Sequence, residues 1–93
     1  MALGSKHRRT LDRIFEEDTR ADIQWDDFEA LVMALGGEWR KPGRTAGSRR
    51  RAVLRSVKGL FHRPHPGSVM KKGSVETARV FLRNAGVAPD TEK

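Results

Sequence analysis

The chain has 93 residues, no cysteine, and a formal net charge of +7 from 19 lysines and arginines against 12 acidic residues. A chain this short makes one domain with a small core, which excludes a large enzyme interior. The absence of cysteine excludes disulfides and thiolate metal sites and fits a cytoplasmic protein. No apolar run is long enough to span a bilayer. The charge favours an anionic partner, and we expect nucleic acid ahead of an acidic protein or a membrane surface.

Two helices are expected in the first third of the chain. The first is predicted over residues 6–17, with Thr10 as its N-cap. The second begins at Asp26, which with Glu29 resembles a capping box, and it ends at Gly36-Gly37. Apolar residues recur at helical spacing in both, namely Leu11, Ile14 and Phe15 in the first and Phe28, Leu31, Val32 and Leu35 in the second.

A β-hairpin is expected over residues 47–66, after a short strand over 38–41. Apolar and charged residues alternate along the outgoing run, which is typical of a half-buried strand. We place the turn at Lys58-Gly59, where glycine suits a positive φ, and the return strand ends at Pro64. The alternation puts Ala52 and Leu54 on one face and Arg49, Arg51, Val53 and Arg55 on the other.

The last helix is predicted to begin at Ser74 and to end near Gly86, with residues 88–93 as a disordered tail. The order helix, helix, strand, strand, strand, helix predicts an α+β fold. It is a three-stranded antiparallel sheet with helices packed on one face and an extra N-terminal helix. The other sheet face is left to solvent or to a partner. The packing should bury Leu31, Leu35, Leu54, Phe81 and Leu82 together.

His62 and His65 stand close together, with Arg63 between them. Histidine is the usual proton shuttle near neutral pH. RNA cleavage needs a base for the ribose 2′-hydroxyl, an acid for the leaving oxygen and cations for the charge on phosphorus. These three residues could supply those groups, and the alternative is that both histidines are ordinary loop residues. We expect no metal or cofactor, because two histidines without cysteine or a nearby carboxylate do not complete a site.

Two groups of cations are candidate phosphate contacts. Arg49 and Arg51 point toward the open sheet face, where arginine can bind phosphate through two hydrogen bonds. Their alternative role is to keep a strand edge basic and so prevent edge-to-edge pairing. Lys71-Lys72 precedes the last helix, where backbone N–H groups attract anions, although such pairs also occur without a ligand. Trp25 and Trp39 are expected in the core rather than stacked on bases.

Over residues 23–87 the chain resembles the HicA family, the toxins of bacterial HicA/HicB toxin–antitoxin systems. Four segments carry the resemblance, in this order. The first is a helix that begins Trp25-Asp26-Asp27-Phe28 and ends Leu35-Gly36-Gly37, and the second is Gly47-Ser48 at the start of the second strand. The third is Pro64-His65 at the end of the third strand, and the fourth is Lys71-Lys72-Gly73-Ser74-Val75 before a helix that ends Asn84-Ala85-Gly86-Val87. The resemblance implies a fold like the double-stranded-RNA-binding domain, mRNA interferase activity and a HicB-like antitoxin partner. Residues 1–22 are then an N-terminal extension outside the family core.

The chain departs from the family pattern at one position. The family's catalytic histidine directly follows the Gly-Ser, and here that position is Arg49. Arginine cannot act as a general base near neutral pH, because its pKa exceeds ~12. Either His65, with or without His62, has taken over proton transfer, or the chain binds RNA without cutting it. The positions that match the family are Gly47, Ser48, His65, Lys71, Lys72 and Gly73.

The first hypothesis is therefore a HicA-like toxin acting on mRNA, a metal-independent endoribonuclease if it is active. Its candidate catalytic residues are His65 and His62, and its candidate RNA-binding residues are Ser48, Arg49, Arg51, Arg63, Lys71 and Lys72. The second is a non-catalytic RNA-binding module of the same fold. The third is a basic protein-interaction module for an acidic partner. Oligomeric state and RNA sequence preference stay open.

Overall fold

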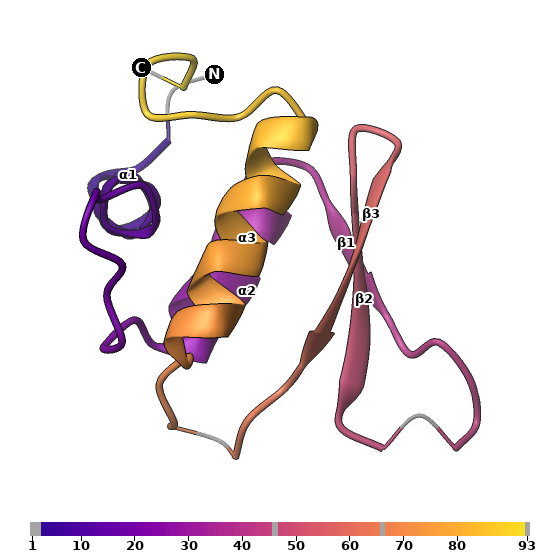
Figure 1. Cartoon of the computed structure of the whole chain (residues 1–93). Coiled ribbons are helices and arrows are strands. Elements are labelled where there is room, and N and C mark those ends of the chain that lie inside the picture. The colour runs from indigo at the N-terminus through magenta and orange to yellow at the C-terminus, as the bar shows by residue number, and fades with distance from the viewer. Residues whose placement is uncertain (1–2, 46, 66, 93) are drawn as a thin grey trace.

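The computed structural model describes residues 3–45, 47–65 and 67–92. Residues 1, 2, 46, 66 and 93 lie outside it, and with them small parts of the predicted N-terminal extension, hairpin and tail. The fold is α+β, as predicted. A three-stranded antiparallel sheet is covered on one face by two helices, and the N-terminal helix packs on those helices (Figure 1). The elements are α1 (Ser5–Ile14), α2 (Trp25–Ala34), β1 (Glu38–Arg40), β2 (Arg49–Leu54), β3 (Val57–His62) and α3 (Lys72–Asn84).

The strands lie in the order β1-β2-β3, and both neighbouring pairs are antiparallel. The hairpin turn is at Arg55-Ser56, between the paired residues Leu54 and Val57. The predicted turn at Lys58-Gly59 is therefore wrong. Both turn residues have positive φ, 49° and 68°, as the primed turns that suit hairpin twist require. Neither residue is a glycine or asparagine, so the sequence lacked the usual signal for this turn.

Gly59 instead lies inside β3, opposite Ala52 on the face that meets the helices. A Cβ atom there would come 2.7 Å from Cδ1 of Phe81 and 3.0 Å from Cε2 of Phe61. Real side chains do not approach this closely, so a glycine is needed for α3 to lie against the strand. This residue therefore serves packing and not the turn.

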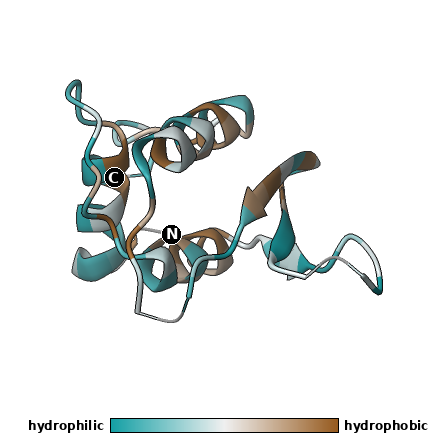
Figure 2. Ribbon diagram, turned by 60° about the horizontal axis from the view of Figure 1, so that its bottom comes forward, coloured by the Kyte–Doolittle hydropathy of each residue, from teal (hydrophilic) through white to brown (hydrophobic). Residues whose placement is uncertain are grey.

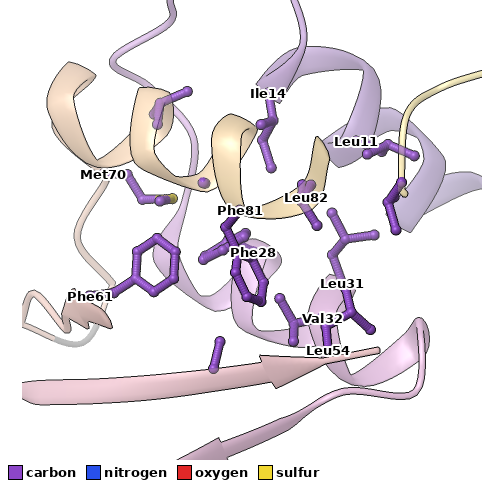
Figure 3. Close-up of a cluster of buried hydrophobic side chains, with 14 of the residues drawn as sticks. Leu11, Ile14, Phe28, Leu31, Val32, Leu54, Phe61, Met70, Phe81 and Leu82 are labelled. Atoms are coloured by element: carbon purple, nitrogen blue, oxygen red, sulfur yellow. The ribbon is translucent and has the colours of Figure 1, made fainter. Parts of the chain in front are cut away.

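Aromatic side chains form the part of the core between the sheet and the helices (Figure 3). The rings of Phe28 and Phe61 are 5.1 Å apart between centroids, and those of Phe61 and Phe81 are 5.7 Å apart, both edge-to-face. Trp25 is buried in this core, as predicted, and Trp39 is partly buried and packs against it, with its ring 5.2 Å from that of Trp25. Of the predicted core set, Leu31, Leu54, Phe81 and Leu82 are buried and Leu35 is partly buried.

The helices begin earlier than the sequence signals suggested. Thr10 is not an N-cap, since it lies buried inside α1 and its hydroxyl donates to the Lys6 carbonyl oxygen at 3.1 Å. Gln24 is the N-cap of α2, so Asp26 lies in its first turn. Lys71 is the N-cap of α3, so Ser74 also lies within the first turn. Each helix carries both hydrophilic and hydrophobic residues, as the colours in Figure 2 show.

Both predicted helix stops are confirmed. Gly36 and Gly86 have φ values of 94° and 76°, in the left-handed region that follows many helices. The next residue donates back in each case, Gly37 N–H to Val32 O at 2.9 Å and Val87 N–H to Leu82 O at 2.8 Å. These bonds satisfy carbonyls at the helix ends.

The chain after α3 runs back to α1 and the hairpin turn. Arg8 donates from Nη1 to the Glu92 carbonyl oxygen at 2.6 Å and from Nη2 to the Pro89 carbonyl oxygen at 3.2 Å. Arg55 pairs with the Glu92 carboxylate at 3.3 Å. The prediction of a disordered tail did not anticipate these contacts. They link three segments that are distant in sequence.

We predict that Gly59→Ala lowers the free energy of unfolding by about 1–3 kcal/mol, because the added methyl group overpacks the contact with Phe81. Urea denaturation measures the change. Gly73→Ala is the control, since nothing lies within 4 Å of a Cβ at that helical position. Alanine is favoured over glycine in a helix, so the control should keep or raise stability. Equal loss in both variants would contradict this account of Gly59.

Candidate nucleic-acid interface

Three segments meet at one end of the molecule: the loop from β1 to β2, the end of β3 and the link to α3 (Figure 1). The Arg63 N–H donates to the Ser48 carbonyl oxygen at 2.7 Å, which joins the first segment to the second. We call this surface the basic end and define it by Ser48, Arg49, His62, Arg63, His65, Lys71 and Lys72. All of these are exposed except Arg63, which is partly buried. They are the predicted site residues apart from Arg51.

Two hollows adjoin at the basic end. The first has a volume of about 330 Å³, and its lining is Trp25, His62, Arg63, Pro64, Val69, Met70, Lys71 and Ser74. The second has a volume of about 460 Å³, and its lining is Ser48, Arg50, Arg63, Pro64 and His65. The two share Arg63 and Pro64. The two histidines therefore line neighbouring hollows, His62 the first and His65 the second. The sequence did not predict this arrangement, because Pro64 interrupts the strand pattern between them.

His62 is paired with Arg49 across β2 and β3, and both side chains lie on the open face of the sheet. The bond from Arg63 to Ser48 makes the adjacent 49–62 pair a non-hydrogen-bonded one, in which Cβ atoms lie about 4.5–5.5 Å apart. The histidine that the resemblance implies at position 49 is thus absent, but another histidine stands directly beside that position. Sequence reasoning missed this pairing because a turn at Lys58-Gly59 places His62 opposite Arg55.

Arg51 is on the same open face, between Arg40 on β1 and Leu60 on β3. It is exposed, as predicted. Arg55 was also expected on this face, and that prediction is wrong because Arg55 lies in the turn and pairs with Glu92. The open face therefore extends the basic end along β2 by one arginine rather than two.

Many arginines away from the basic end already have partners. Arg20 hydrogen-bonds Asp22 and Glu16, and its bond to Asp22 lowers the pKa of that carboxyl to about 2. Arg79 donates to the Ile14 carbonyl oxygen at 2.8 Å and so joins α3 to α1. The remaining ion pairs of the described residues are Lys6 with Asp27, Arg40 with Glu38 and Arg55 with Glu92.

The cations of the basic end are not used in this way. Within residues 3–45, 47–65 and 67–92, none of Arg49, Arg51, Arg63, Lys71 and Lys72 forms an ion pair. Arg50 differs from them, because its Nη1 donates to the carbonyl oxygens of Gly47 and Arg49 at 2.7 and 2.8 Å and thereby holds the entry to β2. The unpaired cations leave a surface suited to an anionic partner.

No group of three or more histidine, aspartate or glutamate side chains that could hold a metal ion is found in the described part of the chain. Among the same residues, no helix has the length and apolar character needed to cross a membrane. No family model matches the chain, and neither a curated protein nor a solved structure matches it. Function must therefore be argued from the basic end itself.

We predict that Arg49→Cys with His62→Cys forms a disulfide under mild oxidation, because non-hydrogen-bonded strand pairs bring Cβ atoms close enough. The chain has no other cysteine, so titration of free thiols measures the reaction cleanly. The matched control is Arg55→Cys with His62→Cys, which joins residues that only the wrong register brings together. Cross-linking of the control in preference to the 49–62 pair would refute the register.

Proposed function

We propose that this chain binds single-stranded RNA through its basic end and acts as a HicA-like toxin on mRNA. The observation that supports this most is the gathering of unpaired cations at one end, while many arginines elsewhere are engaged in structural bonds. Phosphate contacts supply most of the affinity in nucleic-acid binding. Arg49, Arg51 and Arg63 offer planar donors for phosphate oxygens. Lys71 and Lys72 add charge beside the N-terminus of α3.

For cleavage, His62 is better placed than the sequence indicated. A base must remove the 2′-hydroxyl proton so that this oxygen attacks phosphorus, and an acid must protonate the departing 5′-oxygen. His62 stands beside Arg49, whose guanidinium would stabilise the negative charge that develops on phosphorus. His65 opens onto the adjoining hollow with Ser48. The two imidazoles would divide the acid and base roles, with no metal ion required.

A second candidate function is RNA binding without cleavage, and Arg49 itself favours it, because an arginine stands where the family resemblance implies the catalytic histidine. Both candidate functions leave the same cations free for an acidic protein. A HicB-like antitoxin with an acidic surface would occupy the basic end and displace RNA from it. A partner that binds there should therefore compete with RNA rather than form a ternary complex.

We predict that RNA binding weakens steeply with salt and that Lys71→Ala reduces the slope of log K against log salt concentration by about 0.7, the value of one single-strand phosphate contact. Fluorescence anisotropy of a labelled single-stranded RNA measures both quantities. Arg9→Ala is the control, since it removes an exposed cation from α1, which packs against α2 and α3. An equal effect of Arg9→Ala would point to general charge attraction instead of a defined site.

We predict that the pure protein cleaves a long single-stranded RNA in EDTA, and that His62→Ala and His65→Ala each slow cleavage by about 10²-fold or more while binding persists. Gel analysis of the RNA measures the rate. If the parent protein binds RNA and leaves it whole, the non-catalytic function is correct. In that case Arg49→His, which supplies the missing histidine, should create cleavage without strengthening binding.

A further inference from the structure

We propose that the first hollow of the basic end holds one unstacked nucleobase of a single-stranded RNA. This inference rests on the proposed function, and it adds a base-binding site to what is otherwise a phosphate-binding surface. The hollow's volume of about 330 Å³ lies at the small end of the range of about 300–1,000 Å³ for small-molecule sites. That size suits a single base, not a stacked pair.

The walls of the hollow are mainly apolar. Trp25 and Met70, both 2% exposed, form part of its lining from the core side. Val69 is 42% exposed and presents its side chain at the surface. Pro64, which follows the end of β3, completes the apolar part of the lining. Because Trp25 and Met70 are almost fully buried, the apolar surface open to a ligand comes mainly from Val69 and Pro64. Contact with this surface would stabilise the transfer of a base face out of water.

The remaining lining groups are polar, and none of them is acidic. Arg63 and Lys71 supply positive charge, His62 supplies an imidazole, and Ser74 supplies a hydroxyl that can both donate and accept a hydrogen bond. An anionic ligand with an apolar flat part satisfies both halves of this lining. A nucleotide has that composition, since its phosphates would meet the cations while its base contacts the apolar walls.

Backbone bonds hold the hollow in shape. The Met70 N–H donates to the Ile23 carbonyl oxygen at 2.7 Å, and the Trp25 N–H donates to the Ser68 carbonyl oxygen at 3.2 Å. Val69 and Gln24 form a bridge between the same two segments. The walls are therefore formed before any ligand arrives, which lowers the ordering cost of binding. A base paired and stacked in a duplex cannot enter such a recess, so the ligand must be single-stranded.

The first test compares an oligouridine with an abasic oligomer of the same length and charge, using fluorescence anisotropy and the full chain. We expect the oligouridine to bind about tenfold more tightly, because burial of the base against the apolar wall adds to the phosphate contacts. Equal affinity for the two would overturn the base site and leave the proposed RNA binding intact. Binding of neither would overturn the proposed function as well.

The second test is Val69→Glu, which adds negative charge and a polar wall to the hollow. We expect it to remove the tenfold preference for oligouridine over the abasic oligomer. Val80→Glu is the matched control, since Val80 is 52% exposed and lines a different hollow, between α3 and β3. It should keep the preference. Loss of the preference in both variants, or in neither, would place the base elsewhere.

Discussion

The close contact between β3 and α3 is the constraint on which the basic end depends. Gly59 lets the Phe81 ring approach the strand, and Phe81 in turn packs against Phe61. This contact and the Arg55-Ser56 turn are consistent with only one register of β3 against β2. A shift of one residue would turn Phe61 to solvent and His62 into the core. The same packing that stabilises the sheet therefore places His62 beside Arg49.

The arginines of the chain serve two different purposes, structural bonds in one part of the molecule and an exposed charged surface in another. Two arginine side chains distant from the basic end add contacts to a small core, Arg79 between α3 and α1 and Arg8 at the C-terminal segment. Such bonds compensate the positive charge locally, either with carboxylates or with carbonyl dipoles. At the basic end, by contrast, Arg63 and Lys71 line the hollows without an acidic residue in either lining. A small fold thus obtains both stability and a charged surface from one residue type.

Periodicity predicted the fold class and the two faces of β2, and glycine predicted where α2 and α3 end, because apolar spacing and the positive φ at Gly36 and Gly86 are local signals. The predicted end of the first helix at residue 17 was wrong, since α1 ends at Ile14. The register was not predictable in the same way. Glycine in Lys58-Gly59 is a strong turn signal, but the contact that requires Gly59 comes from Phe81, which is distant in sequence. The placement of His62 and the lining of the first hollow depend on that register and on the link through Val69. Sequence reasoning could name the residues of the basic end but not which of them adjoin.

The two proposals are connected through the position of His62. This residue lines the first hollow and is also the cross-strand neighbour of Arg49. A base held in the hollow would place its own ribose at the rim, where the imidazole stands, and the following phosphate toward the arginine. Fixing the nucleotide in this way would supply the orientation that general acid–base chemistry needs, which accounts for a large part of the rate gain in enzymes. Base binding would then determine which phosphate is presented, so that the hollow would govern both affinity and the position of any cut.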